Sequence, residues 1–216
     1  MFLKLLLNFI KHLFGIKPHK QLHNLYKSEQ VLFTFDDGPS PETLNILAIL
    51  KKYNIKAVFF VIGKECIKYP DILHQIVKNN HILGNHSYSH PYHKLNQSEA
   101  SKEIIKTDKI INNITHTTNN LYRLPGGKTN TGLYSYLIKQ NAIIMDWTID
   151  SLDYIHQDTN YIVDNVMSEL TKQKNQKIVL FHDGCAHKNY SRKNTTEALE
   201  IIINKCKQLD IPLNTF

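Results

Sequence analysis

The sequence predicts a single α/β domain built from parallel β/α units. The chain has 216 residues, about the size of one large domain, and shows no Pro/Gly/Ser-rich linker. Strand-like and helix-like segments alternate along it, a pattern typical of a parallel sheet. Clusters of polar residues directly follow the predicted strands. In β/α folds the loops at the carboxyl ends of the strands converge on one face, so these clusters are expected to form one site.

The first half of the chain contains three predicted strands, each followed by a predicted helix. Residues 31–35 form the first strand, which ends in a turn at residues 36–39. Ser40 is a suitable N-cap for the next helix, and Pro41 suits its first position. The continuous apolar run at residues 57–62 predicts a strand buried on both faces. A helix at 71–78, a strand at 81–84 and a helix at 98–113 follow.

The second half continues the alternation with shorter strands. The apolar segments at 121–124, 143–147 and 177–181 predict strands, and 212–216 predicts a last short one. Helices are expected at 161–172 and 195–209. No internal repeat interrupts this order.

Composition narrows the classes of function. The net charge of +7 favours anionic neighbours such as a membrane or cell wall, but the lysines are dispersed, so nucleic-acid binding is not expected. The three cysteines are odd in number and lack C-x-x-C spacing, which predicts neither a disulfide framework nor a structural zinc site. Cys185 follows one of the polar clusters, and we interpret it as a bystander.

Residues 1–30 are expected to be an amphipathic helix and a connector, separate from a domain at 31–216. On a helix, residues 2–16 place a basic polar stripe opposite a wide apolar face. This pattern fits peripheral membrane contact or, equally well, a helix that closes one end of the domain. The segment lacks the A-x-A cleavage site of a signal peptide and is too short to span a membrane. A cell-envelope or membrane-associated location is favoured, with the cytoplasm as the alternative, and the oligomeric state is left open.

Asp36 and Asp37 are adjacent carboxylates at the end of the first strand. Such a pair can divide its work, with one carboxylate binding a metal and the other acting on a water molecule. The alternative is a turn in which both merely accept backbone hydrogen bonds.

His86 and His90 are four residues apart, a spacing that would place both rings on one face of a helical turn. Neutral imidazole is a common ligand for zinc and its neighbours, and two His with one carboxylate leave coordination positions open for water and substrate. With 12 His in the chain, this pair alone is a weak signal.

Two further segments add to these polar clusters, and the set as a whole is a more specific signal than any one of them. Arg123 supplies a permanent cation on a Gly-containing loop. His182 ends a buried strand, a position suited to a general acid, and Asp150 or Asp153 would raise the pKa of its ring by pairing with it.

These motifs, in this order, make the chain resemble the polysaccharide deacetylases with the NodB homology domain, carbohydrate esterase family 4. The resemblance covers residues 31–216 through T-F-D-D-G, H-S-x-x-H, R-x-P-x, D-S-x-D and L-x-H segments. It implies a distorted, incomplete (β/α) barrel. It also implies hydrolysis of N-acetyl groups on an N-acetylglucosamine-containing glycan such as peptidoglycan or a chitin-like polymer.

The resemblance also implies a role for each site residue. Asp36 would be the catalytic base, Arg123 its partner, His182 the general acid and Asp153 the carboxylate that tunes it. A divalent metal would lie on Asp37, His86 and His90; zinc is expected, with cobalt or another first-row metal as alternatives. The Gly126 N–H would stabilise the oxyanion, and Leu180 would line the acetyl pocket.

One motif departs from the family's common form. Tyr154 stands where D-S-x-D-W has Trp, and Trp147 lies seven residues earlier. Both are expected to contact substrate, and the change bears on substrate choice more than on chemistry. Two rival interpretations remain: a metal-dependent deacylase of another amide or an acetyl ester, and a non-catalytic glycan-binding relative, which would have no need of the complete set.

Overall fold

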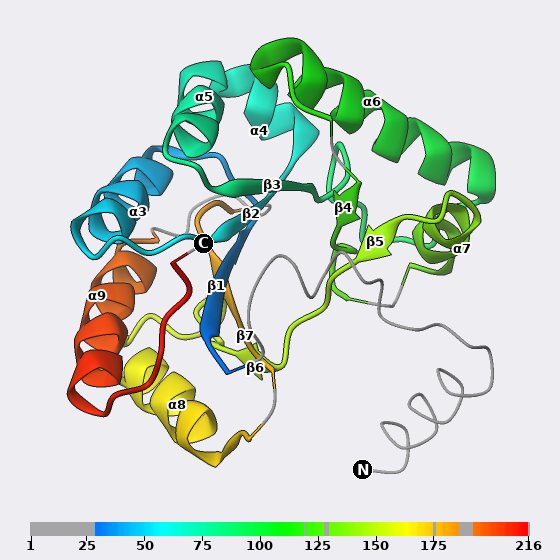
Figure 1. The fold of residues 1–216 in the computed structure, drawn as a ribbon. Helices are drawn as coiled ribbons and strands as arrows, with labels where there is room; N and C mark the ends of the chain where they lie inside the picture. Colours follow the sequence, from blue (N-terminus) through cyan, green and yellow to red (C-terminus); the bar gives the residue numbers. More distant parts are fainter. Residues whose placement is uncertain (1–28, 119, 128–129, 175, 186–191, 216) are drawn as a thin grey trace, which may run out of the picture.

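The computed structural model describes residues 29–118, 120–127, 130–174, 176–185 and 192–215. Its centre is one sheet of seven strands in the order β5-β4-β3-β2-β1-β7-β6, and every pairing is parallel. Figure 1 shows the sheet curving, with the helices following one another around its outer side. Within the described ranges, β5 and β6 are edge strands that do not pair with each other. The predicted distorted, incomplete (β/α) barrel is confirmed.

The strands shorten toward both edges of the sheet. The two longest, β1 (Val31–Asp36) and β7 (Lys177–His182), lie side by side in its interior. Next come β2 (Val58–Val61) and β3 (Ile82–Asn85), then the two-residue strands β4 (Leu121–Tyr122), β5 (Ile143–Ile144) and β6 (Ile149–Asp150).

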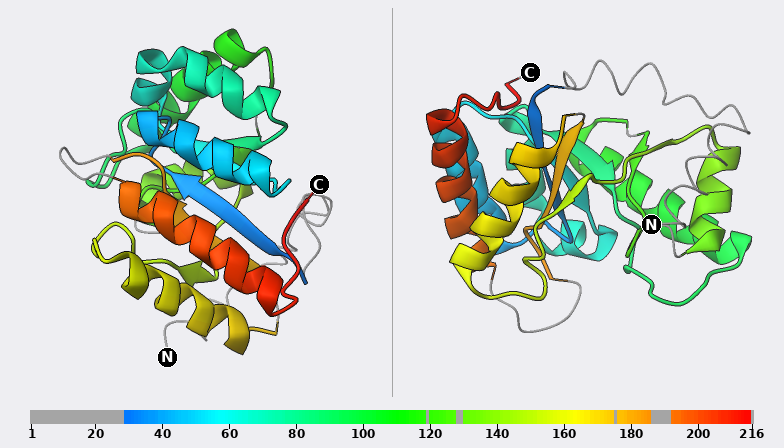
Figure 2. Two further views of the ribbon diagram at one scale, coloured as in Figure 1. Left: turned by 90° about the vertical axis from the view of Figure 1, so that its left-hand side faces the viewer. Right: turned by 90° about the horizontal axis from the view of Figure 1, so that it is seen from below.

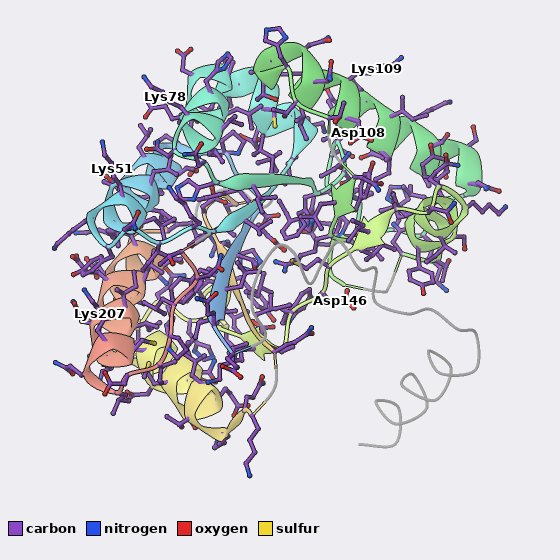
Figure 3. The ribbon with its side chains drawn as sticks, viewed as in Figure 1. Lys51, Lys78, Asp108, Lys109, Asp146 and Lys207 are labelled. Carbon is purple, nitrogen blue, oxygen red and sulfur yellow. The ribbon has the colours of Figure 1, made fainter. Side chains whose placement is uncertain are left out.

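Among the described residues, every helix but the last lies between two successive strands in the sequence, and the last, α9, follows β7. They are α3 (Pro41–Lys52), α4 (Gly63–Lys68), α5 (Pro70–Lys78), α6 (Gln97–Thr115), α7 (Thr131–Lys139), α8 (Thr159–Lys172) and α9 (Lys193–Gln208). Ser40 caps α3 as predicted: its side chain accepts a hydrogen bond from the Glu42 N–H. Figure 2 shows α3 and α9 side by side over β1. In Figure 3 the side chains of Lys51 and Lys207 mark the outer, solvent-facing sides of these helices.

The core lies between the sheet and the helices. Phe35 stacks between Phe59 and Phe181, with ring centroids 5.0 and 5.8 Å apart, and all three side chains are fully buried. Buried aromatic pairs add about 0.5–1.5 kcal/mol beyond the area they remove from water. The core therefore fixes β1 between β2 and β7, and with them the carboxyl-end edge that carries the polar residues.

Several expected elements differ in the structure. The segment predicted as one strand at 143–147 pairs only at Ile143–Ile144, and the chain then crosses to β6 at the opposite edge of the sheet. The last strand predicted at 212–216 is a single bridge between Val31 and Leu213. Helices α4 and α7 were not predicted.

The N-terminal helix predicted at residues 2–16 lies outside the described residues. Among the helices in the described ranges, none combines the length and apolar character needed to cross a membrane.

Candidate active site

A pocket of about 350 Å³ opens where β1, β3 and β7 end. Nine of the eleven sequence-predicted site residues line it: Asp36, Asp37, His86, His90, Gly126, Trp147, Tyr154, Leu180 and His182. The other two, Arg123 and Asp153, lie behind the lining and bond to residues that form it. The structure therefore brings the predicted set together, because the carboxyl ends of parallel strands meet at one edge of the sheet.

Asp37, His86 and His90 converge on one point. Their potential ligand atoms all lie within 4.8 Å of one another, and all three residues are buried. Asp37 Oδ1 lies 3.6 Å from His86 Nε2 and 3.4 Å from His90 Nε2. The backbone at Asp37 has φ 74°, a conformation that residues with side chains rarely adopt.

The hydrogen bonding of His86 shows that this cluster suits a cation. His86 Nδ1 lies 2.8 Å from the Arg123 carbonyl, which can only accept, so Nδ1 carries the proton and Nε2 keeps its lone pair. Burial lowers the pKa of His86 to about 3, so the ring is neutral at neutral pH. The Nε2 lone pair of His86 and the Oδ1 atom of Asp37 thus face each other in a buried space. A bound divalent cation would stabilise this arrangement.

The loop that carries the two histidines is not the expected helical turn. His86 follows β3 directly, and the chain then passes through positive φ at both Ser87 (71°) and His90 (54°). The Ser87 hydroxyl accepts a hydrogen bond from the His90 N–H at 3.1 Å. This tight turn, rather than helical periodicity, brings the two rings to 5.0 Å between centroids.

Asp36 forms the first of two ion pairs beside the pocket. Its Oδ1 accepts a hydrogen bond from Arg123 Nη1 at 2.8 Å, and its Oδ2 lies 3.6 Å from His86 Nε2. The guanidinium also donates to Thr34 Oγ1 and to the Met145 carbonyl, and its side chain is completely buried. Burial raises the pKa of Asp36, while Arg123 acts in the opposite direction.

His182 and Asp153 form the second pair. His182 Nδ1 lies 2.7 Å from Asp153 Oδ1, and Asp153 Oδ2 accepts from the His182 N–H and the Thr195 hydroxyl. Burial acts to lower the pKa of His182, but the charge and hydrogen bond of Asp153 outweigh it and raise the pKa to about 9. Asp150, the other carboxylate considered for this role, accepts from the Leu152 N–H.

The walls of the pocket are apolar and aromatic. The Tyr154 ring meets His182 edge-on, with centroids 5.2 Å apart, and Tyr154 is 40% exposed. Arg123 Cζ lies 5.6 Å from the Trp147 ring, and Leu180 completes the lining from β7. Gly126, at φ 61°, brings backbone to the surface of the pocket.

Two lining residues were not predicted from the sequence. Tyr92 lies with its ring 4.6 Å from that of His90. Arg192 is buried and donates to the Gly184 carbonyl at 2.7 Å and to the Asp153 carbonyl at 3.2 Å. Neither belongs to a motif, and only their place in space connects them with the site. Cys185 also lines the pocket.

Comparisons with known proteins bear on the family of this chain. A family model described as polysaccharide deacetylase matches residues 24–142. A peptidoglycan-N-acetylglucosamine deacetylase of Bacillus cereus is 37% identical over 144 residues, which is 66% of this chain and 52% of that protein. The match thus spans about half the length of that relative.

Solved structures extend the likeness to most of the chain. The peptidoglycan deacetylase PdaC of Bacillus subtilis has 33% identity and a TM-score of 0.74, covering 87% of this chain and 88% of that one. A carbohydrate esterase family 4 pseudoenzyme of Bacillus anthracis has 27% identity and the same TM-score, covering 87% and 64%. Because a pseudoenzyme resembles the chain equally well in fold, the site residues carry the argument about activity.

Proposed function

This chain belongs to the polysaccharide deacetylase family, and on that premise we propose that it hydrolyses N-acetyl groups of N-acetylglucosamine-containing glycans such as peptidoglycan. The observation that supports this most directly is that two ion pairs lie beside the cluster of Asp37, His86 and His90. Asp36 lines the pocket in one pair, and His182 lines it in the other. A non-catalytic glycan-binding protein would need neither the buried Arg123 beside Asp36 nor a charged His182. The pocket volume, about 350 Å³, is in the range of small-molecule sites.

Asp37, His86 and His90 would hold the metal, and we propose zinc because a set of two imidazoles and one carboxylate is typical of catalytic zinc sites. When bound, the ion supplies Lewis-acid chemistry by polarising the amide carbonyl and lowering the pKa of water.

Asp36 is the base in this proposal. Arg123 fixes one carboxylate oxygen, and the other points toward the His86 side of the cluster, where it can accept a proton from the attacking water. The Gly126 N–H stabilises the charge that develops on the substrate oxygen.

His182 is the acid. Asp153 engages Nδ1, so the proton for the leaving nitrogen comes from Nε2. With its pKa raised to about 9, His182 is protonated at neutral pH. This step matters because an amide nitrogen is a very poor leaving group without a proton.

The test is mass spectrometry of N-acetylglucosamine oligomers and peptidoglycan fragments after incubation with zinc-loaded protein. We expect loss of acetyl groups as free acetate, inhibition by a chelator, and recovery on adding zinc. Acetylated xylan serves as the ester comparison. Release of acetyl groups from xylan alone would contradict the amide assignment, and no release from any of these substrates would contradict the enzymatic one.

Membrane contact through residues 2–16 is a separate part of the proposal. It is supported by the basic stripe and apolar face that these residues present on a helix. Deletion of residues 1–17 should release the protein from anionic vesicles and leave turnover of short oligomers unchanged. Loss of folding in the truncated protein would instead favour the alternative that the helix closes the domain.

A further inference from the structure

The loop that carries the two histidines contains two residues in an unfavourable backbone conformation. Ser87 and His90 both have positive φ, which non-glycine residues adopt rarely and keep only where the surroundings impose it. The position of the His90 ring depends on this loop, because residues 86–89 separate it from β3. What holds the loop therefore decides whether both rings reach Asp37.

Glu103, on α6, holds the middle of the loop from outside the pocket. Its Oε2 accepts hydrogen bonds from the Tyr88 N–H at 2.9 Å and the Ser89 N–H at 2.8 Å, and its Oε1 accepts from the Ser89 hydroxyl at 2.9 Å. Both carboxylate oxygens are thus committed to two consecutive loop residues. Hydrogen bonds from N–H groups to a charged carboxylate are roughly twice as strong as neutral ones.

Asn85 supports the start of the loop and ties it to α6. The Ser87 N–H donates to Asn85 Oδ1 at 2.7 Å, and Asn85 Nδ2 donates to α6 at the Ile104 carbonyl and the Asp108 carboxylate. In Figure 3 Asp108 lies on the side of α6 toward the sheet and Lys109 on the outer side.

The start of α4 provides further support: the Gly63 and Lys64 N–H groups donate to the Ser87 and Tyr88 carbonyls. Of these contacts, Glu103 is the one that brings a charged side chain from a distant element to the centre of the loop.

We propose that Glu103 is a positioning residue that sets the affinity of the His86–His90 loop for its metal. The inference rests on the metal site of the proposed function and extends it to a residue outside the pocket. Glu103 does not line the pocket and so touches neither metal nor substrate. It acts by holding the Tyr88 and Ser89 backbone, which fixes the direction in which His90 presents its ring.

Titration of the metal-free full-length protein with Co²⁺ tests this. The readouts are the dissociation constant and the visible absorption spectrum of the cobalt protein, which reports ligand geometry independently of activity. Glu103→Ala should weaken Co²⁺ binding by about 10- to 100-fold and change the spectrum, as is usual when a partner that orients metal ligands is lost. Glu103→Gln keeps an acceptor of the same shape and should recover most of the affinity.

Glu99→Gln is the matched control. It removes a carboxylate one turn away on α6, at an exposed position where Glu99 only caps its own helix. Thermal unfolding of each metal-free variant separates positioning from folding. Ser89→Ala, which removes one of the three bonds, should give a smaller loss of affinity than Glu103→Ala.

The outcomes separate this inference from the proposed function. Wild-type Co²⁺ affinity and spectrum in folded Glu103→Ala would overturn the role of Glu103 and leave the metal site standing. The same loss of affinity in Glu99→Gln would overturn it as well. Failure of the wild-type protein to bind Co²⁺ would overturn both the metal site and this inference.

Discussion

Arg123 Nη1 lies 2.8 Å from Asp36 Oδ1 and His182 Nδ1 lies 2.7 Å from Asp153 Oδ1, yet the two ion pairs present opposite partners to the pocket. In the first pair the carboxylate lines the pocket and the guanidinium is hidden; in the second the imidazole lines it and the carboxylate is hidden. A carboxylate that lines the pocket can accept a proton, and an imidazolium that lines it can donate one. The proposed base and the proposed acid therefore differ in which partner of the ion pair lines the pocket.

The largest effect is expected from Asp36→Asn, which removes the proton acceptor of the first pair. Turnover should fall by about 10²- to 10⁴-fold, the usual contribution of a general base, while zinc content stays at the wild-type level. Steady-state kinetics and metal analysis of the same preparation check this, with the exposed Asp164→Asn as control. Loss of zinc from the Asp36 variant would make Asp36 a ligand and remove the contrast between the pairs.

Arg123→Met removes the buried cation of the same pair. A buried carboxylate left without its cation typically costs about 3–5 kcal/mol, so we expect a loss of that size in the free energy of unfolding. Urea denaturation of the metal-free protein measures it. The double variant Asp36→Asn/Arg123→Met should recover much of the loss, because the stranded charge is gone. A double variant less stable than Arg123→Met would show that the cost arises from packing alone.

The second pair should make stability fall as pH rises. The pKa of His182 is about 9 in the folded protein against 6.5 ordinarily, so its extra stabilisation is complete below pH 6.5 and is lost between pH 6.5 and 9. The shift corresponds to about 3 kcal/mol. Urea midpoints of the metal-free protein at pH 6 and pH 9.5 measure the difference. It should largely disappear in Asp153→Asn; persistence there would assign the pH dependence to other groups.

The same substitution should change the pH profile of catalysis. Asp153→Asn removes the charge that favours the imidazolium, so the basic limb of kcat/KM should move to lower pH by one unit or more. Initial rates on a chitooligosaccharide from pH 6 to 10 measure it, with Asp164→Asn as the control. An unmoved basic limb would mean that a group other than His182 donates the proton.

The smallest effect is expected at the wall beside the second pair. Tyr154→Phe keeps the ring edge against His182 and should leave kcat/KM within about twofold, because the hydroxyl adds little to an edge contact. Tyr154→Ala should raise KM more than it lowers kcat. A large fall in kcat for Tyr154→Phe would give the hydroxyl a part in the chemistry that the comparison of the two pairs does not include.

The sequence was most informative where strands are long and buried. The apolar runs of β1, β2 and β7 predicted both the strands and the edge at which their polar residues meet. It was less informative at the sheet edges, where two-residue strands carry almost no periodic signal. Nothing local indicates that the chain leaves β5 at Ile144 and crosses the whole sheet to reach β6.

The site residues also differ in how well the sequence predicts them. Asp36, Asp37, His86, His90, Arg123 and His182 belong to ordered motifs and were predicted. The spacing of His86 and His90 fits one face of a helical turn, but the structure has a tight loop there, because spacing cannot reveal positive φ at Ser87 and His90. Glu103 and Arg192 were missed. Glu103 belongs to ordinary helical sequence and Arg192 directly precedes α9, and the contacts of both join elements far apart in the chain.

The pairing of β1 with β7 has a consequence for redesign. Asp36 and His182 are register partners at the ends of these strands, so their backbones are held at the spacing of neighbouring strands, about 4.8 Å. The distance between the two proton carriers is thus set by main-chain hydrogen bonding rather than by any loop. The aromatic wall at Trp147 and Tyr154, in contrast, lies outside the named strands. Replacing those two segments with the loops of relatives that have other substrates should therefore change substrate selectivity. The spacing of Asp36 and His182 should stay the same.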